Sequence, residues 1–507
     1  MAGINTLFIK FNDISFHYDD SVTSIFEHVS LHLPRGWTGL VGANGSGKTT
    51  FLRLAAGELT SCSGSIESTG TAVYCSQRTD DPPSSLIELI RAGDSESQKL
   101  MHRLGMENDW YDRWDTLSHG ERKRAQLGAS IRLNPDILAV DEPCNHLDME
   151  TRTKIERLLA EYRGVGLLVS HDRDLLDNLC VRCLFFEPPS IEVRPGGYTD
   201  GLVQKKREEQ SLAAEYHAAD AEYKRLKREI TRRREKAGRS DARRSKRHLA
   251  RGDSDGRSKI DAARLTGKDA KAGRLFNQLK RRVDRVHDRK QSHKIRKTYR
   301  HGIELETAVS HRDALFRIPG GGLSLGETKR LEFENLVMRP DDRIALTGPN
   351  GTGKSTLIEH IYRNLSVERD STVYLPQEVD IEASKHILER LNDLSGDRLG
   401  RVMTIIRRLG SDPERILETK MPSPGEVRKL LLALGMSLTP CLIVMDEPTN
   451  HLDIVSIECL EDALAETRCG LLLVSHDRRF LKRLTTRRWH ITGDNETCRL
   501  EEVYTSV

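Results

Sequence analysis

The chain has 507 residues, of which 37% are hydrophobic and 31% are charged, and its formal net charge is +4 at pH 7. This composition predicts two or three domains with ordinary hydrophobic cores and excludes a wholly disordered chain. No apolar run reaches the ~18 residues that cross a bilayer, and the first residues lack the pattern of a signal peptide. The nine cysteines are scattered. Reduced thiols, no metal site of cysteines and a cytoplasmic location are therefore expected.

The first chemical motif is a glycine-rich loop that reads Gly-Ala-Asn-Gly-Ser-Gly-Lys-Thr from Gly42 to Thr49. Residues 37–41 before it predict a strand, and the residues from Thr50 onward predict a helix. In this context the backbone N–H groups wrap the phosphates of a nucleotide, the lysine neutralises their charge and the hydroxyl holds Mg²⁺. The predicted binding residues are Gly42, Asn44, Gly45, Gly47, Lys48, Thr49 and Thr50.

Two further strands of the first domain end in polar residues. The strand that starts at Ile137 ends in Asp141 and Glu142, and the strand around Leu167 ends before His171. We expect Asp141 to act through the metal and Glu142 to polarise the attacking water. A single histidine is more often structural, but His171 recurs in a repeated context and is therefore a catalytic candidate.

The same motifs recur in the second half at a nearly constant spacing. Lys354 follows Lys48 by 306 residues, whereas Glu447 and His476 follow Glu142 and His171 by 305 residues each. Such an offset predicts an internal duplication of a whole α/β domain, with residues 1–202 and 301–507 as the two copies. The second set of candidates is Gly348, Asn350, Gly351, Gly353, Lys354, Ser355 and Thr356 for the nucleotide, Asp446 for the metal, and Glu447 and His476 for catalysis.

Residues 203–300 form the predicted linker between the two copies. An apolar seam from Leu212 to Ile230 predicts one helix, and Leu275 to Val286 predicts a second one that returns. Two helices of roughly 35 residues each would make a hairpin on the order of 50 Å long. Glycines suggest that its tip lies at about 238–272. Residues 201–300 carry a net charge of +19, while the rest of the chain carries −15. This asymmetry favours a polyanion partner over a merely solvated face.

Two more sequence motifs link the chain to a known family. Residues 117–121 read Leu-Ser-His-Gly-Glu and residues 422–426 read Pro-Ser-Pro-Gly-Glu, and both resemble the LSGGE signature of ATP-binding cassette proteins. Residues 141–148 and 446–453 resemble the DEPTNHLD stretch of the ABC-F subfamily, which consists of twin-cassette ATPases without membrane domains. The resemblance covers the whole chain and implies two P-loop cassettes in tandem, joined by the long basic helical hairpin.

The resemblance also implies how the sites are built. The two cassettes of one monomer pair head to tail, and two ATP molecules with Mg²⁺ lie between them. The loop around Lys48 would face Ser423 and Gly425, and the loop around Lys354 would face Ser118 and Gly120. Further positions carried over from the family are Gln77 and Gln377, which would sense Mg²⁺, and Tyr18, which would stack on adenine.

The second site departs from this pattern, because the offset of 306 carries Tyr18 onto Ser324, which cannot stack on a base. Adenine stacking is therefore in doubt at the second site. His119 and Pro424 replace the first glycine of the signature, although the serine and the second glycine remain. Both sites keep the lysine, aspartate, glutamate and histidine, so both are expected to hydrolyse ATP.

The resemblance further implies a partner. ABC-F proteins enter the exit site of the ribosome and push the linker toward the P-site tRNA and the peptidyl transferase centre, and ribosomal RNA is a polyanion that suits the basic linker. The short segment between Gln77 and Ser118 leaves little room for an additional helical arm, which favours antibiotic resistance by ribosomal protection. Relief of stalled ribosomes remains the alternative. A DNA-directed ATPase and an ATPase subunit of a transporter are less favoured.

Overall fold

The computed structural model describes residues 7–19, 24–145, 147–243, 278–288, 307–326, 329–377, 393–409, 423–493 and 496–503, with single positions at 387, 391, 411, 413 and 416. The chain divides into two compact units, one of residues 1–201 with 300–507 and one of residues 202–299. The first unit holds both predicted cassettes, and the second holds the predicted linker.

The first cassette is built on a sheet whose central strands are parallel. In spatial order its strands are β5 (Ala72–Cys75), β6 (Ile137–Asp141), β7 (Val165–Val169), β3 (Gly36–Gly42), β8 (Cys180–Glu187) and β9 (Ser190–Pro195). A second, antiparallel sheet has β1 (Phe8–Phe16) between β2 (Phe26–Pro34) and β4 (Ser63–Ser68). Strands β6 and β7 are buried at every residue, as expected for central strands covered on both faces.

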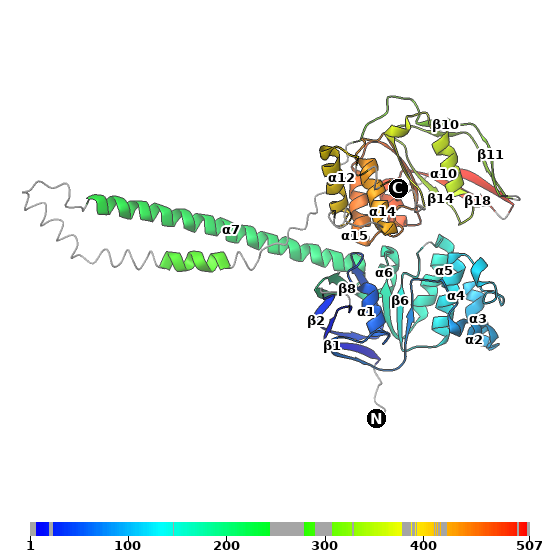
Figure 1. Ribbon diagram of the computed structural model, residues 1–507, viewed down its shortest axis with the longest axis horizontal. Coiled ribbons are helices and arrows are strands. Elements are labelled where there is room, and N and C mark those ends of the chain that lie inside the picture. Colours follow the sequence, from blue (N-terminus) through cyan, green and yellow to red (C-terminus); the bar gives the residue numbers. More distant parts are fainter. Residues whose placement is uncertain are drawn as a thin grey trace, which may run out of the picture. The chain divides into compact units, whose positions relative to one another are not determined.

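Helices follow the parallel strands of the first cassette (Figure 1). They are α1 (Lys48–Ala55), α2 (Ser84–Arg91), α3 (Ser95–Leu104), α4 (His119–Arg132), α5 (Met149–Glu161) and α6 (Arg173–Leu179). Phe51 of α1 packs against Phe11 and Phe186 in the core, with ring centroids 4.5 and 5.5 Å apart. This packing fixes the helix that directly follows the glycine-rich loop.

The second cassette repeats this plan. Its larger sheet has the order β11 (Gly321–Leu325), β12 (Lys329–Phe333), β19 (Thr497–Val503), β18 (Arg487–Gly493), β14 (Arg343–Thr347), β17 (Gly470–Val474), β16 (Leu442–Asp446) and β15 (Thr372–Leu375). A small sheet pairs β10 (Phe316–Ile318) with β13 (Leu336–Met338). Strands β15, β16, β17 and β14 are mutually parallel neighbours, as are their counterparts in the first cassette.

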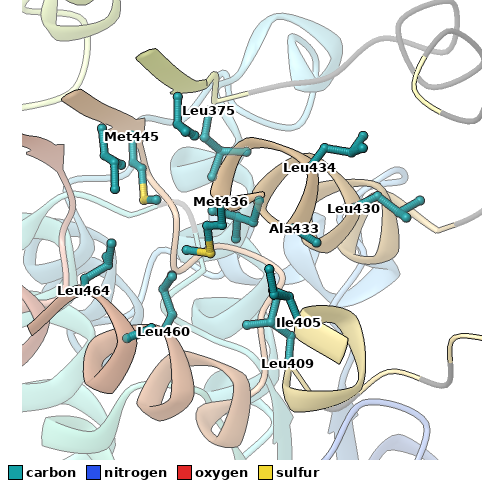
Figure 2. Packing of buried hydrophobic residues seen from close by; sticks show 14 of the residues in the cluster. Leu375, Ile405, Leu409, Leu430, Ala433, Leu434, Met436, Met445, Leu460 and Leu464 are labelled. Carbon is teal, nitrogen blue, oxygen red and sulfur yellow. The ribbon is translucent and has the colours of Figure 1, made fainter. Parts of the chain in front are cut away.

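The helices of the second cassette are α10 (Lys354–Arg363), α12 (Gly396–Arg408), α14 (Pro424–Met436), α15 (Ile454–Ala465) and α16 (Arg478–Leu484). Figure 2 shows how leucines of α14 and α15 pack with Ile405 and Leu409 and with Met445 of strand β16. The predicted α/β class and the tandem repeat are thereby confirmed. The described helices include none that is long and apolar enough to cross a membrane.

The linker unit contains all but the first four residues of α7 (Tyr198–Arg243), the long green helix of Figure 1, and a second helical segment at 278–288. The two segments contact each other, because Arg282 donates to Glu222 at 2.8 Å and the rings of Tyr223 and His287 lie 5.4 Å apart. Of the predicted seam, Ala219 and Leu226 are buried.

Three details of the linker differ from the sequence prediction. Helix α7 has 46 residues rather than about 35. It continues past Gly238, where the tip was expected to begin, because an isolated glycine weakens a helix by only about 1 kcal/mol. Leu212 of the predicted seam is exposed. The remaining tip residues, 244–272, lie outside the described residues, so the predicted turn stays a prediction.

Candidate functional site

The first glycine-rich loop lies between β3 and α1, as its sequence predicts. The Lys48 ammonium donates to the backbone carbonyls of Gly42 and Ala43 at 2.8 and 2.9 Å. Gly47 has φ 94°, and a Cβ there would come within 2.4 Å of Ile25. The loop thus needs glycine at this position, both for its left-handed backbone and for its close packing.

The loop hydroxyl and the acidic strand meet at one point. Thr49 donates from Oγ1 to Asp141 Oδ2 at 2.7 Å, and the Tyr74 hydroxyl donates to the same oxygen at 3.2 Å. Burial raises the pKa of Asp141. A hydroxyl and a carboxylate are hard oxygen ligands of the kind that Mg²⁺ takes beside phosphate oxygens. These two side chains therefore fit a magnesium ion bound together with a nucleotide.

The second loop has the same geometry. Lys354 donates to the carbonyls of Gly348 and Pro349 at 2.9 and 2.8 Å, and Ser355 donates to Gln377 Oε1 at 3.2 Å. A hydrogen bond also joins Ser355 to Asp446, whose pKa burial raises. The loop opens into a pocket of about 510 Å³, which also contains Gly351, Gly353, Thr356, Glu447 and His476.

The predicted Mg²⁺-sensing glutamines differ between the two sites. Gln377 lies beside Ser355, whereas Gln77 is exposed after β5 and, among the described residues, has no hydrogen bond to Thr49. The structure therefore brings only the second glutamine together with its loop.

Each site contains one buried glutamate beside one histidine. The His171 backbone N–H donates to Glu142 Oε2 at 3.3 Å, and the His476 N–H donates to Glu447 Oε2 at the same distance. Burial raises the pKa of each glutamate to about 7 and lowers the pKa of each histidine to about 4. Near pH 7 the imidazoles are thus neutral, and the carboxyls are poised between their two protonation states.

The glutamates also carry backbone strain and an unused acceptor. Glu142 and Glu447 have φ 48° and 50°, a region that non-glycine residues rarely adopt and that recurs at active sites. Their Oε1 atoms are buried and accept no hydrogen bond among the described residues, and they lie 3.3 and 3.4 Å from the Nε2 atoms of His171 and His476. A carboxylate oxygen placed in this way fits a group that holds a water molecule beside a bound nucleotide.

The signature serines start helices. Ser118 caps α4 and Ser423 caps α14, and each forms a capping box with the glutamate three residues later, Glu121 and Glu426. Both serines are exposed at the helix N-terminus, where backbone N–H groups and the helix dipole favour an anion.

Each loop contacts the opposite cassette. The Asn44 backbone N–H donates to Asp453 at 3.0 Å, and the Asn44 side chain donates to the His451 carbonyl at 3.1 Å. That carbonyl lies 3.0 Å from the position that a Cβ of Gly425 would take. In the other half, the Asn350 N–H donates to Asp148. Both loops therefore approach the end of the opposite cassette that holds its signature helix.

The two sites differ in the side chain that is predicted to stack on the adenine ring of ATP. The Tyr18 hydroxyl bonds to Thr50 Oγ1 at 3.0 Å, and its ring is exposed beside helix α1. At the second site Ser324 lines the loop pocket, and the described residues that line it include no Phe, Tyr or Trp. The stacking of adenine on Tyr18, and its doubtful counterpart at the second site, stay predictions.

The sequence search missed two supporting pairs that obey the offset of 305. Lys123 is buried and donates to the carbonyls of Ser76 and Asp141, while Arg428 donates to the carbonyls of Glu447 and Asn450. The second pair is Asp148, which caps α5, and Asp453, which caps α15. Each aspartate accepts a hydrogen bond from the glycine-rich loop of the opposite cassette. Searching for any polar residue repeated at that offset would have found both pairs.

Comparisons with known proteins agree with this geometry. The family model described as ABC transporter matches residues 26–145 and 331–450. The ATP-binding protein Uup of Caulobacter vibrioides is 31% identical across 92% of this chain and 74% of its own length. The chain belongs to the ABC-F family.

Another ABC-F relative is the ribosome protection protein VmlR of Bacillus subtilis, which is 25% identical across 98% of this chain and 88% of its own length. Among solved structures, an RNase-L inhibitor superposes with a TM-score of 0.63 at 17% identity, covering 97% of this chain and 91% of that one. At that identity the likeness supports the tandem-cassette fold alone.

Proposed function

We propose that this ABC-F chain hydrolyses ATP at two Mg²⁺-dependent sites formed between its cassettes, with the cassettes at 1–202 and 301–507 and the linker at 203–300. The observation that carries the proposal is the duplicated set of a loop lysine, a buried aspartate, and a buried glutamate beside a histidine. Lys48 and Lys354 bind phosphates, and Thr49 with Asp141 and Ser355 with Asp446 hold the metal.

Glu142 and Glu447 are the proposed bases. Each has a pKa near 7, which matches a group that takes a proton from water at neutral pH. His171 and His476 lie beside them in neutral form and can accept a hydrogen bond from the reacting groups. Ser118 and Ser423 bind the nucleotide of the opposite cassette, so that ATP holds the cassettes together until it is hydrolysed.

The proposed target is the ribosome, and the proposed role is antibiotic resistance by ribosomal protection. VmlR is by name a ribosome protection protein, and the chain aligns with 88% of its length. The basic linker suits ribosomal RNA, because phosphate contacts supply most of the affinity of such surfaces. The protein would bind at the exit site with its linker directed toward the P-site tRNA.

Co-sedimentation with ribosomes tests this proposal. The Glu142→Gln/Glu447→Gln variant should bind ATP without hydrolysing it, and it should pellet with ribosomes only when ATP is present. Lys48→Ala/Lys354→Ala serves as the matched control, because it removes the phosphate-binding ammonium groups and should remain in the supernatant. Sedimentation that is independent of ATP, or none at all, would refute the ATP-dependent ribosomal role.

Drug susceptibility then separates protection from relief of stalling. Expression in a sensitive bacterium should raise the inhibitory concentration of antibiotics that bind near the peptidyl transferase centre, and the Glu142→Gln/Glu447→Gln variant should not. Unchanged susceptibility across the panel, together with ATP-dependent ribosome binding, would favour the stall-relief role instead.

A further inference from the structure

A second cavity lies behind the second phosphate loop and is distinct from the pocket into which that loop opens. Its volume is about 610 Å³, within the range of small-molecule sites. It is lined by β14, β18 and α16 of the second cassette and by the start of α5 of the first cassette. Met149, Ala345 and Leu481 give it apolar walls.

Three cations line this cavity. Within the described part of the chain, no ion pair joins Arg478, Lys482 or Arg488 to an acid, and Arg488 donates its Nε to Thr347 Oγ1 at 2.8 Å. The two carboxylates of the lining are already engaged. Asp148 accepts from the Thr151 N–H at 2.9 Å, and Glu150 pairs with Lys154 at 2.7 Å.

The counterpart of Arg478 in the first cassette has a carboxylate partner. Arg173, the counterpart of Arg478 at the offset of 305, is buried and makes a bidentate bond to Glu461. The counterpart of Glu461 is Glu156, which accepts from Asn178 Nδ2 at 2.7 Å instead. Arg173 of the first cassette therefore has a carboxylate partner from the second cassette, whereas Arg478 of the second cassette lies at the edge of a cavity.

We propose that this cavity binds a small organic oxyanion, in which a carboxylate or phosphate pairs with Arg478 and Lys482 and an apolar body rests on Met149 and Leu481. Both His476 and His490 also line it, and burial lowers the pKa of each. Near pH 7 the two histidines are thus neutral, and the positive charge that would bind the anion comes from Arg478, Lys482 and Arg488.

The cavity adjoins the second ATP site. Pro349 and His476 line the cavity and also belong to that site, where the Pro349 carbonyl accepts from Lys354 and the His476 ring contacts Asn350 at 3.2 Å. A ligand in the cavity would therefore contact the loop that binds ATP at the second site and would change ATP binding or hydrolysis there.

The test uses the full chain and the fluorescent aromatic sulfonate 1-anilinonaphthalene-8-sulfonate, an oxyanion on an apolar body. Titrations compare the affinity of the probe for the unchanged chain with its affinity for Arg478→Gln/Lys482→Gln and for Thr486→Trp, which places a large ring in the lining of the cavity. Arg407→Gln, an exposed cation elsewhere in the same cassette, is the matched control. The first two variants should raise the Kd of a saturable site about tenfold or more, and the control should leave it unchanged.

Each arm of the experiment has an outcome that overturns the proposal. Equal affinity in all variants would place the probe elsewhere. Mg-ATP is also added to the bound probe, both in the Glu142→Gln/Glu447→Gln variant and in the cavity variants. If Mg-ATP displaces the probe equally in all of them, the probe binds in a nucleotide site and not in this cavity. Competition by octanoate assigns a carboxylate and competition by hexyl phosphate assigns a phosphate, whereas competition by neither compound would refute binding of natural oxyanions.

Discussion

Glu142 and Glu447 are the site residues whose titration falls near neutral pH, because burial raises the pKa of each to about 7. If each acts as the base in its ionised form, the kcat/KM of ATP hydrolysis should rise as the pH increases from 6 to 8, with an apparent pKa of about 7. The histidines should cause no further change in kcat/KM above pH 5, since burial lowers their pKa values to about 4. Steady-state rates across this range check the prediction, and a flat profile contradicts it.

The same burial predicts a change in stability. A carboxyl whose folded pKa lies above its unfolded value resists ionisation in the fold, so it destabilises the fold progressively as the pH rises from about 4.5 to 7. Glu142→Gln/Glu447→Gln should therefore raise the free energy of unfolding at pH 8, by up to an order of 3 kcal/mol per glutamate.

Denaturant unfolding of this variant at pH 8 and pH 5 measures the effect. The gain should be smaller at pH 5, where the native glutamates are protonated in the fold. A Glu88→Gln variant is an exposed control with no expected gain of this kind, and an equal gain at both pH values would exclude burial of charge as its cause.

At the residue scale, the sequence predicts the groups that repeat with a recognisable motif and misses those that act through backbone contacts. Lys48, Asp141 and Glu142 follow from their positions at a loop and at a strand end. The role of Lys123 could not be predicted in this way, because its ammonium bonds to main-chain carbonyls that only the fold brings together.

At the scale of elements, the signature helices depend on their caps. Ser423→Ala should lower the free energy of unfolding by about 1 kcal/mol, since alanine cannot accept from the Glu426 N–H, whereas Ser423→Asn should keep the cap and the stability. If the serine also binds a nucleotide, asparagine should restore stability but not ATP hydrolysis. Thermal unfolding and hydrolysis rates of both variants provide the test, and recovery of both properties by asparagine would leave capping as the sole role.

Helices α6 and α15, from different cassettes, are joined by the buried pair of Arg173 and Glu461. Removing one partner leaves a buried charge, so Arg173→Met should destabilise the chain by about 3 kcal/mol, near the lower end of the usual range because Arg483 still contacts Glu461. Arg173→Met/Glu461→Leu should recover much of this loss. Urea unfolding of both variants checks the prediction, and a double variant as unstable as the single one would contradict it.

Strands and helices near the motifs could be predicted because apolar runs and turn residues specify them locally. The extent of α7 could not, because its seam is weak and its surface is mostly charged. Whether the helix ends at Gly238 depends on the cost of about 1 kcal/mol that a glycine adds to a helix interior. A difference of this size cannot be predicted from the pattern of residues.

At the scale of the whole molecule, charge is divided between a basic linker and an acidic remainder. On α7 the cations Lys224, Lys227, Arg228 and Arg232 line one hollow of about 410 Å³. Lys224 pairs with Asp220, but the described residues offer no acidic partner within ion-pair distance to the other three. A surface with uncompensated cations is suited to phosphates, so its contribution to binding should depend strongly on salt.

The final prediction therefore concerns Lys227→Glu/Arg228→Glu/Arg232→Glu. This variant should weaken ATP-dependent ribosome binding at least tenfold near 0.1 M salt, and it should reduce the slope of log affinity against log salt by about 2 to 3, since each lost phosphate contact removes about 0.7 to 0.9. Its ATP hydrolysis without ribosomes should be unchanged, because α7 carries no residue of either proposed site.

The matched control reverses three exposed cations of the cassettes, Lys99, Arg407 and Arg468, and so changes the net charge equally. Filter binding of labelled ribosomes over a series of salt concentrations separates the two variants. If both lose the same affinity and the same salt slope, net charge alone attracts the chain to the ribosome. Loss confined to the α7 variant means that the linker itself contacts RNA, because only a local contact releases counterions from particular phosphates.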